Sequence, residues 1–365
     1  MKKITVLVDV FYLKAAVAGI GSYIREFEAS CKDHGSDNFN YLFSHDINKL
    51  VGNSVFLNSN NRIIRWIFQL RYLIYKQIQL PLKILFSNAD YVICPDYIAP
   101  YFTFKAKRIT VLHDSLFWDQ KKNYSFLWNK YFISLINLGI NKGTQIITTS
   151  NYSKKNLIKI LGSDNSISSV YQSFNFLKTS STNYKTPENY LLHIGSFEKR
   201  KDLITLVKAF KLVNHSNLKL VLAGAQIING NSEVLNEIKT FISQNKLEGK
   251  VILAGYVSKA EASLLYKNAL LYVFPSIDEG FGIPILEALS FSVPVICSDI
   301  DVFGEVGGDC VEYFKVGDSI SLSKKIISVL DSDKLRQNDN TKHINKFSRK
   351  NFIKGFERII LDNND

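Results

Sequence analysis

The second half of the chain alternates short apolar runs with segments of helical periodicity. The runs are apolar on both faces, as buried parallel strands are, and they lie at 190–194, 218–223, 251–254, 270–274 and 293–297. Helical patterns fill the intervals between them, at 203–213, 233–245, 259–268 and 285–290. Strands that alternate with helices predict a doubly wound α/β domain, whose ligands bind beyond the carboxyl ends of its strands.

The first half repeats this pattern less regularly. Strands are predicted at 4–10, 91–94, 109–112 and 145–148, and helices at 22–31, 62–80 and 154–161. The polar segment 178–188 lacks periodicity and reads as a linker, whereas the tail 348–361 has the apolar stripe of a helix. We therefore expect two Rossmann-like domains facing each other across a cleft. Their predicted bounds are 1–180 and 186–345, with a C-terminal helix in 346–365 that packs back toward the first domain.

Length and composition agree with two globular domains. The chain has 365 residues, of which 46% are hydrophobic and 21% charged, and this excludes disordered, collagen-like and coiled-coil proteins. The charge is uneven, because residues 1–180 hold 22 Lys and Arg against 11 Asp and Glu, and the remainder holds 23 against 22. A basic first half indicates a polyanionic partner: nucleic acid, anionic lipid or an acidic substrate.

Several classes of site and segment are not expected. The four cysteines are scattered without the paired spacing of a zinc or redox site, and we interpret them as reduced packing residues of a cytosolic protein. Asp9 interrupts the N-terminal apolar run, which argues against a signal peptide, and no run reaches 18 apolar residues. Asp-x-Asp occurs at 299–301 and 331–333, but such triplets are common by chance, and we expect no metal.

The stretch 274–289, FPSIDEGFGIPILEAL, is the most informative about chemistry. A predicted strand runs into a turn that contains Gly280 and Gly282, and a helix follows. Glycines let a ligand approach the backbone, and helix N-terminal amides bind phosphate or sugar oxygens. Glu279 in the turn and Glu287 in the helix suit the recognition of hydroxyl groups. The alternative is a glycine turn with solvated glutamates.

Glu-x7-Glu inside this stretch resembles the signature of family 4 glycosyltransferases, which are retaining enzymes with the GT-B fold. Further segments along most of the chain match that family; they are 19–23, 113–114, 149–153, 195–202, 255–258 and 292–295. The resemblance implies a nucleotide-sugar substrate and no metal or other cofactor. It also implies attack on the donor from the side of the leaving phosphate, which itself accepts the acceptor's proton.

The segment 195–202, GSFEKRKD, resembles the family's phosphate-binding segment. Arg200 and Lys201 follow a predicted strand, where paired cations would stabilise a diphosphate; the alternative is a solvated charge run. Many relatives carry Gly-Arg where this chain has Gly195-Ser196, so one expected cation is absent, and we expect Arg200 to replace it.

The resemblance also assigns roles to single residues. It places Glu279 on the donor sugar and Glu287 on the ribose, with Arg200, Lys201, Glu279 and His113 as catalytic residues. Donor contacts are further implied for Gly21, Val257, Gly280, Phe281, Gly282 and Ile283.

Two of these assignments have plainer alternatives. His113 ends a predicted strand, where a lone histidine is commonly a hydrogen-bonded structural residue. Gly19 and Gly21 form half of a dinucleotide fingerprint, but no third glycine follows, so an NAD site is not favoured. His193 lies inside a predicted strand and is assigned to the core.

The predicted helix 62–80 has an apolar stripe and a stripe that is basic and aromatic. Such a helix suits an anionic membrane surface, and the alternative is a packed helix with a solvated basic face. The residues expected to contact the acceptor or membrane are Arg62, Arg65, Trp66, Arg71 and Lys76. High salt should weaken this association. RNA-binding signatures are absent, so nucleic acid is not favoured.

Together these features predict a retaining hexosyltransferase. Its His-Asp and Arg-Lys-Asp segments resemble those of bacterial mannosyltransferases and rhamnosyltransferases of surface polysaccharide synthesis. The resemblance implies a nucleotide diphosphate sugar as donor, GDP-mannose first, and a glycan or lipid-linked glycan as acceptor. The expected location is the cytoplasmic face of the inner membrane. One alternative is an isomerase resembling nucleotide-sugar 2-epimerases, which would consume donor without an acceptor. Another is a non-catalytic glycan-binding partner, which would have no need of Glu279, Glu287 or Lys201.

Overall fold

Two units make up the chain in the computed structural model. The first comprises residues 1–174 and 347–365, the second comprises residues 175–346, and each is described by itself. The structure describes residues 3–14, 19–50, 62–119, 126–140, 143–162, 166–175, 183–224, 232–332 and 339–363. The side chains of Arg62, Ile63, Arg65 and Ser232 lie outside this description, as do residues 178–182 of the predicted linker.

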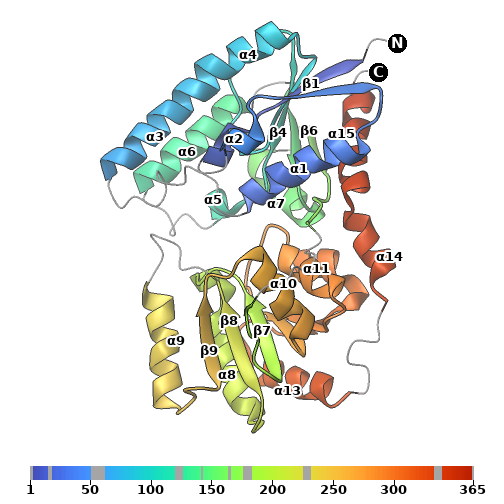
Figure 1. Cartoon of the computed structure of the whole chain (residues 1–365). Helices are drawn as coiled ribbons and strands as arrows, with labels where there is room; N and C mark the ends of the chain where they lie inside the picture. The colour runs from blue at the N-terminus through green and yellow to red at the C-terminus, as the bar shows by residue number, and fades with distance from the viewer. Residues whose placement is uncertain are drawn as a thin grey trace. The chain divides into compact units, whose positions relative to one another are not determined.

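A parallel six-stranded sheet in the order β2-β1-β3-β4-β5-β6 forms the centre of the first unit (Figure 1). Its strands are β1 (Ile4–Val8), β2 (Phe39–Phe43), β3 (Tyr91–Cys94), β4 (Lys107–Val111), β5 (Gln145–Thr148) and β6 (Ser166–Ser169). Its helical segments are η1 (Phe11–Lys14), α1 (Ile20–His34), α2 (Ile47–Leu50), α3 (Arg62–Ile74), η3 (Tyr75–Gln79), α4 (Leu80–Ser87), α5 (Leu116–Asp119), α6 (Phe126–Gly139), α7 (Asn151–Leu161) and α15 (Arg349–Asp362). The strand order reverses between β1 and β3, because β2 lies on one side of β1 and the later strands lie on the other. Sheets of this kind bind ligands at such a switch point.

The second unit contains another parallel sheet, in the order β12-β11-β10-β7-β8-β9. Its strands are β7 (Tyr190–Ile194), β8 (Lys219–Ala223), β9 (Val251–Gly255), β10 (Leu271–Phe274), β11 (Val295–Ser298) and β12 (Glu312–Phe314). Its helical segments are η5 (Lys199–Lys201), α8 (Leu203–Val213), α9 (Ser232–Gln244), α10 (Lys259–Asn268), α11 (Ile283–Ser290), α12 (Asp301–Gly307), η6 (Gly308–Cys310), α13 (Ser319–Leu330) and α14 (Thr341–Ile344), and η7 (Asn345–Phe347) joins the units. This is the Rossmann strand order, which reverses between β7 and β10.

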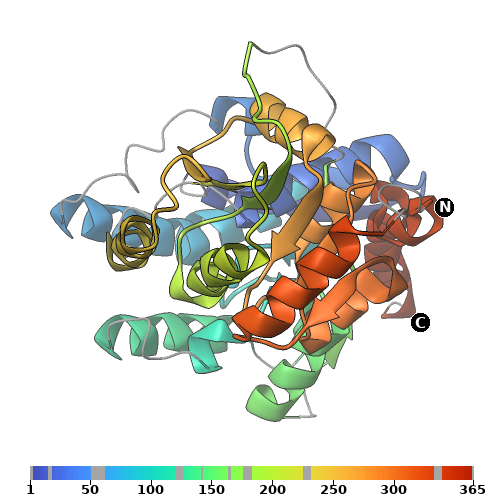
Figure 2. The ribbon, with the colours of Figure 1, turned by 90° about the horizontal axis from the view of Figure 1, so that it is seen from below.

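The predicted elements of the second half are confirmed within one or two residues at most ends. Buried apolar side chains of β7, β8 and β10 pack against α8 and α13 on one face, and α13 lies along α8 (Figure 2). The short β12 and the helices α12 and α13 were not predicted, and neither were β2, β6 and α6 of the first unit. β2 and β6 are edge strands with few fully buried positions, so their hydrophobic pattern is weak.

The C-terminal helix α15 packs on α1 within the first unit. Phe352 and Phe356 stack edge-on against Phe27, with ring centroids 5.6 and 4.8 Å apart. Arg349 forms ion pairs with Glu26 and Asp33, both at 2.9 Å. Aromatic packing in the core and charge pairing at its edge therefore hold the end of the chain on the first unit.

Candidate functional site

The switch point of the second unit brings two loops together. The loop after β7 carries Arg200 and Lys201, and the loop after β10 carries Glu279. Their backbones are joined directly, because the Ile277 amide donates to the Arg200 carbonyl at 2.8 Å. Since β7 and β10 are adjacent parallel strands, residues 78 positions apart in the sequence meet at one edge of the sheet.

A nearly buried charge cluster occupies this edge. The Glu279 carboxylate forms an ion pair with Lys201 through Oε1 and another with Arg200 through Oε2, the latter at 2.8 Å. The three side chains are between 9 and 22% exposed. Burial alone would raise the pKa of Glu279, but the two cations outweigh it and hold the pKa below the usual value. Glu279 is therefore ionised at neutral pH and neutralises part of the positive charge.

Lys201 is held from two directions. Its Nζ lies 4.8 Å from the centre of the Phe274 ring, in a cation–π contact, and it donates to Glu279. Burial lowers the pKa of Lys201, and Glu279 opposes that shift. An ammonium group held in this way is oriented in advance for an anion that enters at the strand ends.

Glu287 lies on α11 and contacts a different partner. The hydroxyl of Tyr266 donates to its Oε2 at 3.0 Å. Burial raises the pKa of Glu287 to about 7, although Tyr266 and Lys259 lower it by smaller amounts. α11 begins after Gly282, whose φ of 116° favours glycine; a Cβ there would also lie 3.1 Å from the Phe303 ring.

The other predicted donor contacts of the second unit follow β9 and β10. Gly280, Phe281 and Ile283 belong to the loop after β10 and to the start of α11. Val257 follows β9 and is half-buried, next to Ser258, which caps α10 together with Glu261.

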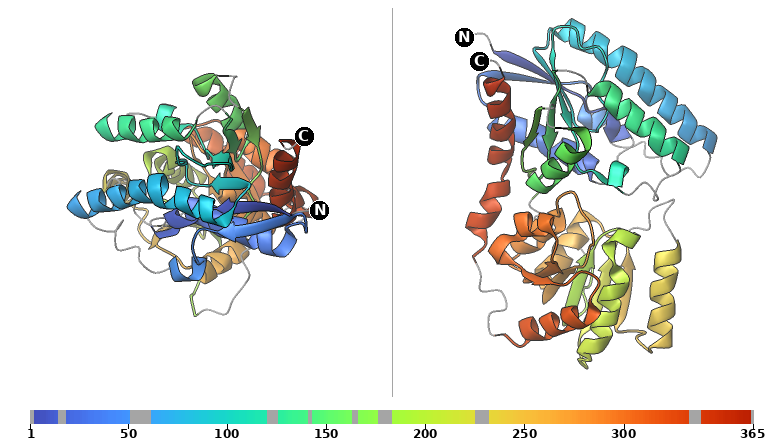
Figure 3. Two further views of the ribbon diagram at one scale, coloured as in Figure 1. Left: turned by 90° about the horizontal axis from the view of Figure 1, so that it is seen from above. Right: turned by 180° about the vertical axis from the view of Figure 1, so that it is seen from behind.

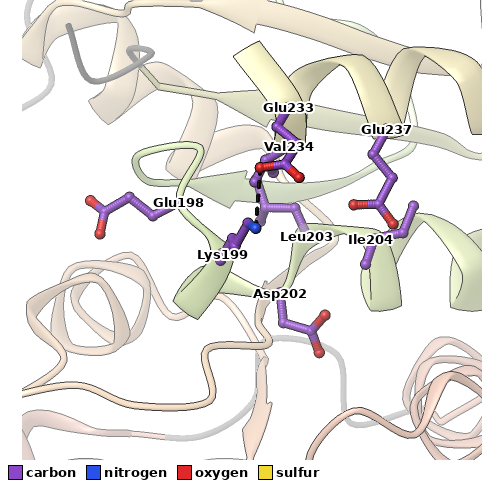
Figure 4. A pocket seen from close by; sticks show the side chains of 8 residues that line it. All are labelled: Glu198, Lys199, Asp202, Leu203, Ile204, Glu233, Val234 and Glu237. Atoms are coloured by element: carbon purple, nitrogen blue, oxygen red, sulfur yellow. Dashed lines mark ion pairs between the residues drawn. The ribbon is translucent and has the colours of Figure 1, made fainter. Parts of the chain in front are cut away.

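A small cavity adjoins the cluster on the far side of the η5 loop. It has a volume of about 140 Å³, and it is lined by Glu198, Lys199, Asp202, Leu203, Ile204, Glu233, Val234 and Glu237 (Figure 4). Lys199 pairs there with Glu233 at 3.1 Å, and both side chains are 66% exposed. The Glu198 side chain points away from that pair (Figure 4) and forms an ion pair with Arg200 instead.

His193 is buried in the core of the second unit, as predicted. Its Nδ1 lies 3.0 Å from the Val273 carbonyl, and burial lowers the pKa to about 4. A Cβ on Gly195 would lie 2.8 Å from its Nε2. The glycine that opens the predicted phosphate-binding segment therefore leaves room for this imidazole.

His113 and Gly21 belong to the first unit. His113 follows β4, and its Nε2 hydrogen-bonds to the Pro95 carbonyl at 2.8 Å. The ring stacks edge-on against Tyr23 at 4.7 Å, and burial lowers the pKa of His113 to about 4. Thr149 and Ser153 donate to the His113 carbonyl at 3.0 and 3.1 Å. The Thr-Ser-Asn-Tyr-Ser segment thus holds the backbone of a neutral histidine, while Gly21 is buried in the first turn of α1.

The switch point of the first unit contains a buried lysine that the sequence predicts to be on the surface. Lys76, predicted to contact acceptor or membrane, has a fully buried side chain. Its Nζ lies 2.6 Å from Asp9, after β1, and 2.6 Å from Asp96, after β3. Tyr72 donates to Asp96 and Tyr75 to Asp9, each at 2.8 Å. Lys76 is therefore part of a buried charge cluster, because the two carboxylates attract it into the crevice between the strand ends.

The helix that carries Lys76 is also differently built from the prediction. It runs without a break through α3, the π-helical segment η3 and α4 (Figure 3). Its polar and aromatic face is buried, and its apolar face is exposed at Trp66, Ile67, Leu70, Ile74, Ile78, Leu82, Leu85 and Phe86. We call these eight residues the apolar face. Arg71 is exposed, and the side chains of Arg62 and Arg65 lie outside the described residues.

Sequence reasoning missed two contributors to the cluster in the second unit. Glu198 contacts Arg200, and Ser196 contacts Glu198, at 2.7 and 2.5 Å. The acidic residues that flank the three cations of Glu-Lys-Arg-Lys-Asp are the signal that could have indicated Glu198. No sequence signal indicates Tyr266 as the partner of Glu287, because the two residues meet only when their helices pack together.

Comparison with known proteins was informative for both units. Residues 177–345 match the family described as Glycosyl transferases group 1. Nearly the whole of the second unit therefore matches this family. O-antigen chain mannosyltransferase RfbU of Salmonella typhimurium is 33% identical over 183 residues, which are 50% of this chain and 50% of that protein. O-antigen chain mannosyltransferase B of Escherichia coli is 33% identical over 153 residues, 41% of this chain and 39% of that protein.

The aligned regions thus span half or less of the length of these group 1 relatives. A solved structure of Anabaena HepE in complex with UDP and glucose has a TM-score of 0.71 at 15% identity, and the match covers 99% of each chain. The fold is accordingly GT-B. In the described parts of the chain, no three His, Cys, Asp or Glu side chains group as a metal ion would require. Among the described helices, none has the length and apolar composition needed to cross a bilayer.

Proposed function

We propose that the protein transfers mannose from a nucleotide diphosphate sugar to a glycan, with retention of anomeric configuration. The observation that carries this proposal is the cluster of Arg200, Lys201 and Glu279 at the switch point of the second unit. Such a point is where Rossmann-type sheets bind nucleotides. Two cations beside an ionised carboxylate suit a ligand that has both phosphates and hydroxyl groups.

The cluster is suited to stabilising a departing nucleotide diphosphate. Breaking the bond between sugar and phosphate leaves negative charge on the phosphate oxygens. Arg200 and Lys201 would hold that charge from fixed positions, which lowers the barrier because no reorganisation is needed at the moment of reaction. Glu279 would bind sugar hydroxyls, and Glu287 would bind the ribose. In the first unit, the neutral His113 would support the transferred sugar.

Two arguments concern the identity of the donor. The O-antigen relatives are mannosyltransferases, which favours GDP-mannose and surface polysaccharide synthesis. The HepE structure holds UDP and glucose, so a uridine nucleotide is the second choice. A thermal-shift screen of GDP, UDP and dTDP sugars tests binding, and transfer to lipid-linked glycans, with the product linkage determined by NMR, tests the reaction. An inverted product would contradict the proposal.

The same assay separates transfer from isomerisation. A transferase consumes donor in proportion to the acceptor added, whereas an isomerase resembling 2-epimerases consumes it with no acceptor present. We expect the donor alone to be stable over the time in which added acceptor is glycosylated. Conversion of the donor into an epimer would favour the isomerase.

Donor affinity is expected to rise between pH 6 and pH 8. Glu287, with a pKa of about 7, is mainly protonated at the lower pH and ionised at the higher one. An ionised carboxylate accepts hydrogen bonds from both ribose hydroxyls, so its deprotonation favours binding. Calorimetric titration with GDP-mannose would measure this. The Glu287→Gln variant should bind more weakly at pH 8 and lose the pH dependence; a slope retained in that variant would assign the titration to another group.

We further propose that the apolar face binds the cytoplasmic surface of the inner membrane, where lipid-linked acceptors reside. Four of its eight side chains, those of Trp66, Leu70, Ile78 and Phe86, are 57–79% exposed. A continuous apolar surface of this kind is uncommon on a protein surface without a partner. The exposed Arg71 and the basic excess of residues 1–180 favour anionic lipid and oppose pairing with a second copy of this chain.

Binding through the apolar face should respond to mutation and to salt differently from binding by electrostatic attraction alone. The Leu70→Asp/Phe86→Asp variant should lose at least about tenfold in affinity for phosphatidylglycerol vesicles, because each side chain buried in lipid contributes about 1.5–3 kcal/mol. Part of the wild-type binding should persist in high salt. Leu212→Asp, at a half-exposed leucine of α8 in the second unit, is the matched control. Equal sedimentation of both variants with vesicles would contradict the proposed face.

A further inference from the structure

We infer that Glu198 is a positioning residue for donor binding and acts by fixing the orientation of Arg200. The inference rests on the proposed function of the switch-point cluster. Glu198 is not among the site residues predicted from the sequence. The starting observation is that a carboxylate lies beside the cations expected to bind a diphosphate.

The contacts of Glu198 divide between its two oxygens. Oε2 accepts from Arg200 Nε at 2.7 Å, and Oε1 accepts from the Ser196 hydroxyl at 2.5 Å. On its other side, Arg200 lies 2.8 Å from Glu279 through Nη1, which also donates to the Asp278 carbonyl at 3.3 Å. The guanidinium plane is thus held at Nε by its own loop and at Nη1 by the loop after β10.

Electrostatic attraction of the donor does not explain why a carboxylate lies beside Arg200. A carboxylate beside a diphosphate repels it, so charge alone would favour a neutral residue at position 198. A long arginine side chain, in contrast, loses rotamer freedom whenever it binds an anion, and a partner that fixes it beforehand reduces that loss. The hydrogen bond from Nε to Glu198 fixes the side chain before the donor arrives.

Ser196 completes the arrangement. The serine hydroxyl donates a hydrogen bond without adding charge, so the carboxylate stays oriented and its charge stays with Arg200. Ser196 and Glu198 therefore form a chain of hydrogen bonds that ends on Arg200.

The two explanations of Glu198 predict opposite results. If it positions Arg200, Glu198→Ala should raise the dissociation constant and KM for GDP-mannose or UDP-glucose about tenfold, as expected for the loss of a hydrogen bond to a charged group. The kcat should change much less. Glu198→Gln retains an acceptor for Nε and should recover part of the affinity. If Glu198 only adds negative charge, both variants should bind the nucleotide sugar more tightly than wild type.

A matched control and a double variant complete the test. Glu233→Gln removes a carboxylate that pairs with Lys199 beyond the same loop and touches neither Arg200 nor Glu279; its affinity should equal that of wild type. Glu198→Ala in an Arg200→Ala background should cause no further loss, since Glu198 acts through Arg200. Additive losses would overturn the inference, as would wild-type affinity in Glu198→Ala. Failure of wild type to bind any nucleotide sugar would instead contradict the proposed function.

Discussion

Lys201→Ala is expected to lower kcat/KM for glycosyl transfer by at least about a hundredfold, the usual effect of removing one preorganised group that stabilises developing charge. Lys201 is the most buried cation of the cluster, and Phe274 and Glu279 hold its ammonium group in place. Water cannot replace it without losing that orientation. Initial rates with GDP-mannose and a lipid-linked acceptor would measure the effect.

The fold should survive this change, because Arg200 remains beside Glu279 and keeps that carboxylate paired. Lys199→Ala removes an exposed lysine from the same turn, and it should leave both activity and thermal stability near wild type. Glu279→Ala should be as inactive as Lys201→Ala, since it removes the partner of two cations and the proposed sugar contact. Full activity in Lys201→Ala or Glu279→Ala would show that the cluster is not the site of transfer.

Lys76→Ala is expected to reduce the free energy of unfolding of the first unit by about 3–5 kcal/mol, the range for removing one partner of a buried ion pair. Asp9 and Asp96 would be left together without a counter-charge, and both side chains are at most 1% exposed. All three tryptophans lie in the first unit, at positions 66, 118 and 128. Their fluorescence during urea unfolding therefore reports on that unit within the full chain.

The destabilisation should depend on pH. Burial already raises the pKa of Asp96 to about 6, although Lys76 opposes the shift, whereas the pKa of Asp9 is below its usual value. Removing Lys76 raises both pKa values, so the variant takes up protons as the pH falls and its deficit shrinks. Arg71→Ala, at an exposed cation of the same helix, should change stability by less than about 0.5 kcal/mol. An equal deficit at pH 5 and pH 8 would contradict this account.

Much of the second unit could be predicted from sequence, because its strands are apolar on both faces and its turns carry glycine. Tyr190–Ile194, Leu203–Val213 and Lys259–Asn268 are reproduced to the residue. The position of Lys201 and Glu279 after adjacent strands follows from the same pattern, since carboxyl ends of parallel strands share one edge.

The helix 62–80 shows the limit of such reasoning. Its amphipathic pattern was recognised, but a pattern does not say which face turns inward. Usual burial preferences would place the isoleucines inside and the lysine outside. Asp9 and Asp96 reverse that orientation, because two carboxylates from distant strands are close enough to pair with Lys76 only once the sheet has formed.

The sequence by itself therefore determined the α/β architecture, the family resemblance of the second unit and the residue types at its switch point, because these depend on local periodicity and motif spacing. Only the tertiary structure decided which charges pair. It assigned Lys76 to the core, exposed the apolar face and joined Glu198 to Arg200, because Coulombic attraction and burial depend on distances between segments far apart in the chain.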